Sequence, residues 1–111
     1  MADRKDLGID QGSSVNIQIL VTDSTGEPLD LSTFTKRSQM RRHFSSANYF
    51  SFTCNTGNDE AGEIILSLTP EESANIPAGH YQYDVEIVSS DNEVFRVVEG
   101  RITVFPEVTK D

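Results

Sequence analysis

One stretch of the sequence, residues 76–104, constrains the fold most, because apolar and polar residues alternate along much of it. Alternation with a period of two is typical of a β-strand that buries one face. The polar run at 89–93 divides the stretch, which therefore predicts one long β-hairpin. Because an isolated hairpin is only marginally stable in water, the rest of the chain must supply an opposing layer. The apolar positions of the first strand are Tyr81, Tyr83, Val85 and Ile87.

Upstream segments show the same alternation and are predicted as further strands. Clusters of Gly, Pro, Asn, Asp and Ser separate them, as expected for turns. About seven strands with turn signals every 8–12 residues are typical of an immunoglobulin-like antiparallel β-sandwich. We therefore predict an all-β fold of this class, as a single domain over residues 1–111. The predicted upstream strands are residues 15–21, 35–44, 49–54 and 63–68.

The two ends of the chain and one connector lie outside this pattern. Residues 1–12 are predicted as a loosely ordered N-terminal arm, with Leu7 and Ile9 held against a sheet edge. Residues 105–111 are predicted as a C-terminal tail. A short helical turn is predicted at 69–75, since this segment combines a capping box with proline at the first helical position.

Four residues around the hairpin have predicted structural roles. Pro77 and Gly79 form the tight turn before it, because proline presets φ and glycine accepts positive φ. Tyr81 has the position of a tyrosine corner, in which the phenol bonds back to the preceding loop. Gly100 interrupts the return strand and is predicted to mark a β-bulge.

The charge of the chain limits its partners. A formal net charge of −9 argues against nucleic acid, whose phosphates need a basic surface. The sequence has no run of about 18 apolar residues that could cross a membrane, and the segment after Met1 has no apolar core of a signal peptide. Four of the nine basic residues nevertheless fall in one window, Lys36, Arg37, Arg41 and Arg42. They form either a solvated strand edge that discourages pairing or a docking patch for an acidic neighbour.

The sequence contains no motif of catalysis or metal binding that rises above chance. Cys54 is the single cysteine and alternates with two phenylalanines, so core packing is favoured over a catalytic thiol. His43 and His80 lie on different predicted segments without zinc-ligand spacing. The polar loop at 55–60 does not match a calcium-binding loop. We therefore expect no enzyme, no metal and no cofactor, unless a deep cleft brings two or more carboxylates together.

Seven segments, in this order along the chain, carry a resemblance to a known group of proteins: residues 7–12 (LGIDQG), 26–32 (GEPLDLS), 38–42 (SQMRR), 62–69 (GEIILSLT), 77–87 (PAGHYQYDVEI), 96–100 (RVVEG) and 103–109 (TVFPEVT). Together they resemble small virion structural proteins of tailed phages, in particular of cyanophage-like myoviruses. A looser likeness is to the N-terminal domain of phage baseplate upper proteins. The chain departs at residues 32–34 (STF), where a Thr-Gly-Tyr-like corner is expected.

The resemblance implies a non-enzymatic structural or adaptor protein of the virion, a tail or baseplate component assembled in the host cytoplasm. Its expected partners are other virion proteins, with a homo-oligomer as a further possibility. Aromatic and arginine side chains favour interface cores, so Tyr49 and Phe105 join the four basic residues as interface candidates. Two alternatives stay open, a carbohydrate- or ligand-binding sandwich module and a capsid decoration protein.

Overall fold

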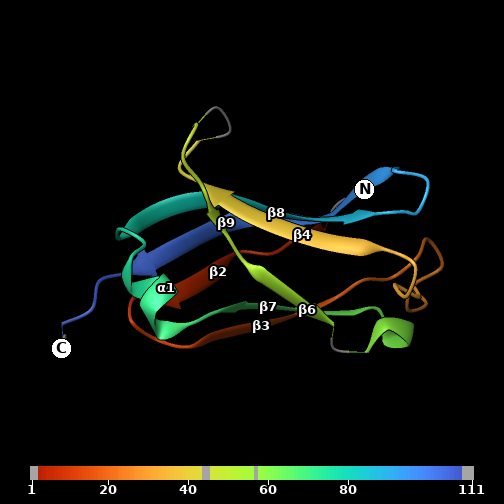
Figure 1. Ribbon diagram of the computed structural model, residues 1–111, viewed down its shortest axis with the longest axis horizontal. Helices are drawn as coiled ribbons and strands as arrows, with labels where there is room; N and C mark the ends of the chain where they lie inside the picture. Colours follow the sequence, from red (N-terminus) through yellow and green to blue (C-terminus); the bar gives the residue numbers. More distant parts are fainter. Residues whose placement is uncertain (1–2, 44–45, 57, 109–111) are drawn as a thin grey trace.

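The computed structural model of the protein describes residues 3–43, 46–56 and 58–108. In this part of the chain, six strands form a larger sheet and three form a smaller one, and Figure 1 shows the two layers face to face. The predicted class, an immunoglobulin-like β-sandwich, is confirmed. The elements in chain order are β1 (Asp3–Arg4), β2 (Leu7–Asp10), β3 (Val15–Leu20), β4 (Thr35–Arg41), β5 (Phe50–Ser51), β6 (Thr53–Thr56), the 3-10 turn η1 (Asp59–Ala61), β7 (Glu63–Leu68), α1 (Pro70–Ala74), β8 (Gly79–Val88) and β9 (Val94–Phe105).

The smaller sheet has the order β3-β7-β6 and is antiparallel throughout. Val15 lies opposite Leu68 at one end of the β3–β7 pair, and Leu20 lies opposite Glu63 at the other. Every second residue of β7 is buried against the larger sheet, as the alternation predicted. The predicted strands at 15–21 and 63–68 are therefore confirmed to within one residue.

The larger sheet is built around the β8–β9 hairpin, with β4 and β5 on one side and β1 and β2 on the other. The four predicted inward residues of β8, from Tyr81 to Ile87, are all buried. In the turn, the Ser89 amide donates to the Glu93 carbonyl at 2.9 Å, and Asn92 adopts a φ of 64°. This central pairing confirms the long hairpin.

The β-bulge of the hairpin lies at Val97 and not at Gly100, so the predicted position was wrong. Val85 pairs with Val98 and Glu86 with Arg96, which leaves Val97 as the extra residue. At Gly100, a Cβ atom would collide with the carbonyl oxygen of Lys5. A glycine within a strand can mark either a bulge or a close backbone approach, and here the second cause applies.

The N-terminal segment is part of the larger sheet rather than a loosely ordered arm. Strands β1 and β2 both pair with β9, in parallel. Ile9 is buried in the core, and Leu7 packs against it from the edge, as the sequence predicted. The Lys5 amide donates to the Glu99 carbonyl at 2.9 Å. Residues 1–2 of the predicted arm and 109–111 of the predicted tail lie outside the described residues.

One predicted strand, at 49–54, is divided between the two sheets. Strand β5 pairs with β4 in the larger sheet, whereas β6 pairs with β7 in the smaller one. Between them, buried Phe52 donates its amide to the Ser38 carbonyl at 3.0 Å. Phe50 and Cys54 are half-buried and pack against the core, so all three predicted inward residues do face inward. The preceding strand β4 ends at Arg41, and the last predicted residue of that strand, Phe44, lies outside the described residues.

The predicted helical turn is α1, and its capping box is formed. The Glu72 amide donates to Thr69 Oγ1 at 3.2 Å, and the Thr69 amide donates to Glu72 Oε1 at 2.8 Å. Both bonds satisfy amides that have no partner within the helix. Buried Ser73 donates its hydroxyl to the Ser13 carbonyl at 2.7 Å, which ties the helix to the start of β3.

The predicted tyrosine corner is also present. The Tyr81 hydroxyl donates to the Pro77 carbonyl at 2.5 Å. Gly79 opens β8 with a φ of 137°, and a Cβ atom at this glycine would collide with the Arg42 guanidinium. Pro77, Gly79 and Tyr81 thus fix the path of the chain from α1 into the hairpin.

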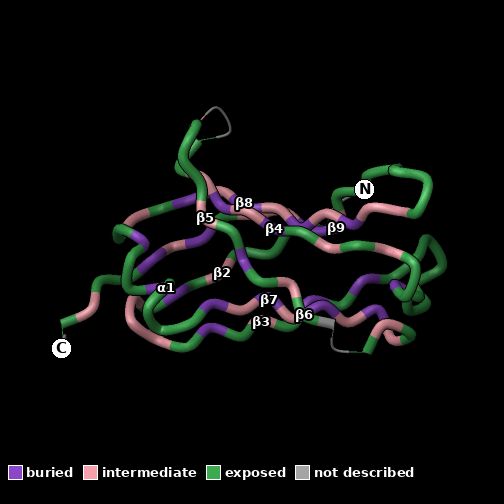
Figure 2. The backbone as a smooth tube through the Cα atoms, viewed as in Figure 1, coloured by how far each residue is buried: buried purple, intermediate pink, exposed green. Residues whose placement is uncertain are grey.

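The core lies between the two sheets, and Figure 2 shows buried and exposed residues alternating along the strands that enclose it. Fully burying one such aliphatic or aromatic side chain contributes about 1.5–3 kcal/mol, so this layer is the main source of stability. Residues from connecting segments, Leu31 and Ile76, close the two ends of the core.

Candidate interaction surfaces

The four predicted basic residues do not form one patch, because alternation along β4 sends them to opposite faces. Lys36 has the same parity as buried Ser38 and points inward, with only 8% of its side chain exposed. Its Nζ lies 2.8 Å from Asp59 Oδ1 of η1, so the ion pair joins the two sheets. Arg37 points outward and pairs with Glu86 at 2.7 Å. Lys36 is therefore a structural residue and is not available to a partner.

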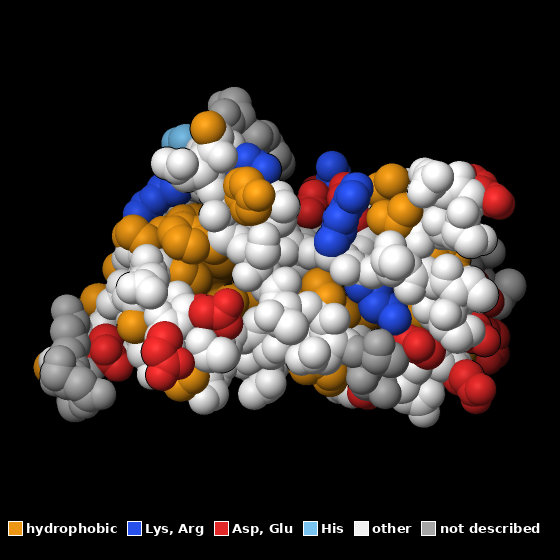
Figure 3. Space-filling view, in the orientation of Figure 1, with side chains coloured by type: hydrophobic (Ala, Val, Ile, Leu, Met, Phe, Trp, Pro, Cys, Tyr) orange, Lys and Arg blue, Asp and Glu red, His pale blue; other side chains and the backbone are white. Residues whose placement is uncertain are grey.

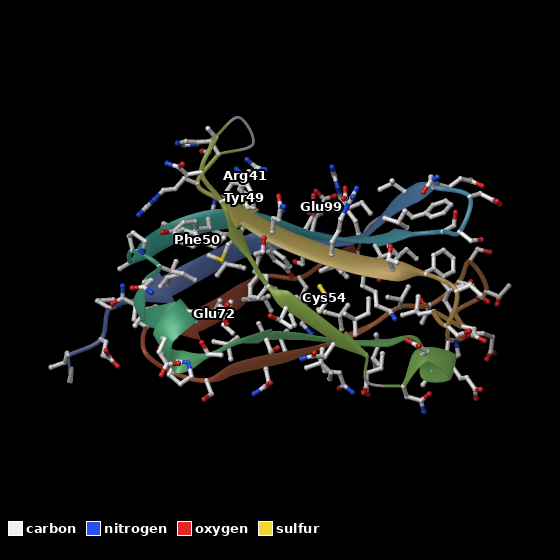
Figure 4. All side chains as sticks on the ribbon, viewed as in Figure 1. Arg41, Tyr49, Phe50, Cys54, Glu72 and Glu99 are labelled. Carbon is white, nitrogen blue, oxygen red and sulfur yellow. The ribbon has the colours of Figure 1, made fainter. Side chains whose placement is uncertain are left out.

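Half-buried Arg41 and exposed Tyr49 form a pair at the end of β4. The Arg41 guanidinium carbon lies 4.6 Å from the centroid of the Tyr49 ring, and Figure 4 shows the two side chains together on the segment that projects from the sandwich. Arg41 also donates to the Ser46 carbonyl and, at 3.1 Å, to Gln39 Oε1. These contacts hold an aromatic ring and a cation in fixed positions at the surface.

Arg42 extends this arrangement toward the tyrosine corner. Its guanidinium carbon lies 4.7 Å from the centroid of the Tyr81 ring, and it donates to the Ala78 carbonyl at 3.1 Å. Phe50 meets the Tyr81 ring edge-on, with the centroids 6.2 Å apart. We call this surface the arginine–aromatic corner and define it by Arg41, Arg42, Tyr49, Phe50 and Tyr81.

Phe105, the other predicted interface aromatic, is not part of this corner. It ends β9, and β8 and β4 separate β9 from β5 in the strand order of the sheet. Its ring covers Gly8 on β2, where an added Cβ would lie 3.1 Å from a ring carbon. Half of Phe105 remains exposed, so it is a separate exposed aromatic at the end of the sheet.

A second surface, which the sequence did not predict, is an apolar groove of about 730 Å³ at the start of β4. We call it the end groove. Its most exposed large apolar members, Val94 and Phe95, are 49% and 46% exposed. The groove is lined by Asp3, Val21, Thr22, Asp23, Ser24, Leu29, Phe34, Ile87, Val94, Phe95, Arg96 and Val97.

The backbone beside the end groove is an open strand edge. Within the described residues, β9 has a neighbour on its outer side only from Val98 onward, where β1 begins to pair. The stretch from Val94 to Val97 therefore pairs with β8 alone. The sequence does contain a signal for this surface. Val94 and Phe95 are adjacent bulky apolar residues directly after a polar turn, and because neighbouring residues of a strand point to opposite faces, one of them must be exposed.

The rim of the end groove is acidic. Asp23 accepts hydrogen bonds from the amide and hydroxyl of Thr25 and from the Glu27 amide, at 2.9, 2.6 and 3.1 Å. These bonds hold the pKa of Asp23 below its usual value and keep its carboxylate charged. Figure 3 shows acidic side chains gathered at this end of the molecule. The loops there, at 22–34, 58–62 and 89–93, contain no Lys or Arg and carry Asp23, Glu27, Asp30, Asp59, Glu60, Asp91 and Glu93.

The outer face of the larger sheet is charged but internally paired. Arg96 Nε lies 3.3 Å from Asp84 Oδ2, beside the pair of Arg37 and Glu86. Partial burial, and then the neighbouring Glu86, raise the pKa of Asp84 above its usual value. Because these charges already have partners on the same face, this surface offers a new partner less than the corner or the groove does.

The remaining candidates for chemistry are separated from one another. Burial raises the pKa of the Cys54 thiol, which makes it a poor nucleophile. His43 and His80 are both exposed, and His80 Nδ1 lies 3.0 Å from Thr103 Oγ1. Over the described residues, no group of three or more His, Cys, Asp or Glu side chains is placed to hold a metal ion.

None of the helices in this part of the chain has the length and apolarity needed to span a bilayer.

The fold is an immunoglobulin-like sandwich. In one sheet the parallel β2–β9 pair lies beside β8 and β4, and the other sheet has the order β3-β7-β6.

No family model matches this sequence, and no curated protein matches it. Among solved structures, the SrpA adhesin (R347E mutant) of Streptococcus sanguinis is similar with a TM-score of 0.53 at 9% identity, over 91% of this chain and 55% of the adhesin chain. An internalin-like protein of Listeria monocytogenes gives 0.51 at 16% identity, over 94% of this chain and 28% of the other. The copper resistance protein PcoC of Escherichia coli gives 0.48 at 20% identity, over 94% and 91% of the two chains. The similarities to the adhesin and to the internalin-like protein show the fold alone.

Proposed function

We propose that the protein is a non-enzymatic structural adaptor of a tailed-phage particle, located in the tail or baseplate and acting through contacts with other virion proteins. One observation carries the proposal: two surfaces of unlike chemistry lie at the two ends of β4. The arginine–aromatic corner follows Arg41, and the end groove includes Phe34, directly before Thr35. The order of sequence segments that resembles phage virion proteins supports the same role.

The separation of the two surfaces suits a connecting protein. Strand β4 has seven residues, which corresponds to about 20 Å along the strand. Two neighbours could therefore bind at the same time without competing for one site. Arginine and aromatic side chains are enriched at the centres of protein interfaces. The corner presents two arginines and the exposed Tyr49 ring, with half-buried Phe50 beside them and the buried Tyr81 ring beneath Arg42.

Detection of the protein in purified particles tests this role. Particles of the phage that carries the gene are purified by density-gradient centrifugation. Gold-labelled antibodies against the recombinant protein are applied to them, and the label is located by electron microscopy. We expect label at the tail or baseplate, and peptides of the protein in the mass spectrum of the particles. Particles that contain neither label nor peptides would refute the proposal. The matched control is a phage in which the gene is deleted, whose particles must remain unlabelled.

The same experiment separates the alternatives. Label over the head of the particle would indicate a capsid decoration protein in place of a tail or baseplate component. A carbohydrate-binding module would instead bind a glycan array through its exposed aromatic ring, so that binding would be lost in Tyr49→Ala. Tyr49 is 49% exposed, but the chain contains no Trp and only three Tyr, which is a poor composition for a sugar-binding platform.

A further inference from the structure

We propose that the partner of the end groove is a second copy of this chain, which inserts its arginine–aromatic corner head to tail. This inference deepens the proposed function and depends on its assignment of the two surfaces as contact sites. It commits to one geometry: Tyr49 of one copy covers the apolar floor formed by Phe34 and Phe95 of the next, and Arg41 meets the acidic rim. The argument has three parts, which concern apolar area, charge and rigidity.

The apolar parts of the two surfaces are complementary. The groove exposes Val94 and Phe95, each to nearly half of its area, beside an open strand edge that no described strand covers. The corner presents Tyr49, which is also half exposed. A tyrosine carries a large apolar ring with a polar tip, so it can fill a groove of this kind while its hydroxyl stays at the rim. Burial of both surfaces removes exposed apolar area that an isolated chain leaves in water.

The charges are complementary as well. The corner carries Arg41 and Arg42, and the loop at 42–49 contains no carboxylate. The end groove has Asp3 and Asp23 in its lining, and the latter is held in its charged form by its own turn. The cation of the lining, Arg96, is paired with Asp84. In Figure 3, acidic side chains lie at the right-hand end of the molecule, although others lie along its lower left. A chain with a net charge of −9 repels its copies in most orientations, so this orientation is favoured electrostatically over the others.

The corner is already rigid before it binds. Arg41 holds the Tyr49 ring from one side while it donates to Ser46 and Gln39. A guanidinium has five N–H donors, so others remain for a carboxylate of the neighbouring copy. Because the side chains are held in place, little conformational entropy is lost on docking.

The geometry of the contact determines the kind of assembly. The corner and the groove are different surfaces, so each copy uses one of them for each neighbour. Such a heterologous contact forms a closed ring or an open chain, whereas a contact between two identical patches stops at a dimer. The inference therefore predicts assemblies larger than two at high concentration.

Sedimentation velocity of the purified full chain tests the inference. The monomer has a mass of 12.3 kDa, and we expect the average mass to rise above this value as the concentration approaches about 1 mM, the range of weak contacts. Because the contact includes exposed ion pairs, the association should weaken when salt is raised. A chain that remains monomeric over the whole range at low salt would overturn the inference.

Two variants and a mixture locate the contact. Tyr49→Ala removes the corner anchor, and Val94→Lys places a cation in the groove; each should weaken self-association at least about tenfold. The matched control for the second is Val108→Lys, because Val108 is also an exposed valine (96%) but follows the opposite end of β9; it should associate like the wild type. Circular dichroism and thermal melting confirm that all three variants fold.

The mixture gives the decisive result. Tyr49→Ala keeps an intact groove and Val94→Lys keeps an intact corner, so an equimolar mixture should form a heterodimer that cannot grow further. A mixture that stays monomeric while the wild type associates would show that another surface is used, and the inference fails. If the mixture experiment fails, the proposed location of the protein in the particle is not affected. If the protein is not found in purified particles, the proposed function is refuted, but the self-association measured here still stands.

Discussion

The hydroxyl of Tyr81 donates a hydrogen bond to the carbonyl oxygen of Pro77, 2.5 Å away, and this bond fixes the entry of the chain into the central hairpin. Tyr81→Phe removes the bond but keeps the ring, which packs against Phe50 and under the Arg42 guanidinium. We expect the free energy of unfolding to fall by about 1 kcal/mol, the usual net value of an intramolecular hydrogen bond.

Equilibrium unfolding in urea measures this change. Tyr49→Phe is the matched control, because the same hydroxyl is removed from a tyrosine that is half exposed. Its effect should stay within about 0.5 kcal/mol, as for most surface substitutions. Equal losses in both variants would contradict a special role for the tyrosine corner.

The ion pair of Lys36 and Asp59 is expected to contribute more to stability than the ion pair of Arg37 and Glu86, which also involves β4. Lys36→Met leaves Asp59 without its partner, and the free energy of unfolding should fall by about 1–3 kcal/mol. Arg37→Met breaks an ion pair in which the arginine is 57% exposed, so the expected loss is below about 1 kcal/mol. Urea unfolding of the two variants at low and high salt compares them directly, and an equal loss in both would refute the distinction.

Much of the fold follows from alternation along the sequence. The period of two predicted the strands that became β3, β7, β8 and β9, and for β3, β7 and β8 it also predicted which face is buried. The same rule, applied to β4, would have placed Lys36 on the inner face with Ser38 and Met40. The basic window instead suggested one patch, because nearness in the sequence was taken for nearness on the surface.

Other features depend on contacts between distant residues and have no local signal. Alternation through Phe50, Phe52 and Cys54 is the same whether the segment stays in one sheet or crosses to the other, so the split into β5 and β6 was not predictable. The glycine signal at Gly100 was read as a bulge, because the approach of Lys5 comes from a segment almost a hundred positions away. The end groove likewise combines the 22–34 loop with the start of β9.

Gly100→Ala tests the close approach of the N-terminal segment. The new methyl group would collide with the Lys5 carbonyl, and overpacking of this kind costs typically about 1–3 kcal/mol. The bonds from the Lys5 amide to Glu99 and from the Arg101 amide to Asp6 should weaken with it. We therefore expect faster hydrogen exchange across residues 3–10, measured by mass spectrometry.

Gly26→Ala is the control for that experiment. Gly26 has a φ of 85° with open space around it, so alanine should destabilise the protein by about 1–2 kcal/mol through backbone strain alone. Exchange across residues 3–10 should then remain as in the wild type. If both variants accelerate exchange there, the effect reflects global stability and not the contact with Lys5.

Alkaline pH should destabilise the protein through Tyr83. This side chain is buried and donates to the Lys5 carbonyl at 2.5 Å, and burial raises its pKa from 10.0 to about 12. Between these values the unfolded chain releases the phenolic proton while the folded chain retains it. The folded state then binds more protons, so the free energy of unfolding falls as pH rises from about 10 through about 12.

Tyr83→Phe isolates this contribution, because phenylalanine has no proton to release. At pH 8 the variant should be less stable than the wild type, since the bond to Lys5 is lost. Toward pH 11 the free energy of unfolding of the wild type falls because Tyr83 ionises in the unfolded chain, and that of the variant lacks this decrease. The difference in free energy of unfolding between the two proteins must therefore shrink. Urea unfolding at pH 8, 10 and 11 measures it, with Tyr49→Phe as the exposed control. A difference that stays constant with pH would show that Tyr83 ionises equally in the folded and unfolded chains, which is incompatible with its burial under the N-terminal segment.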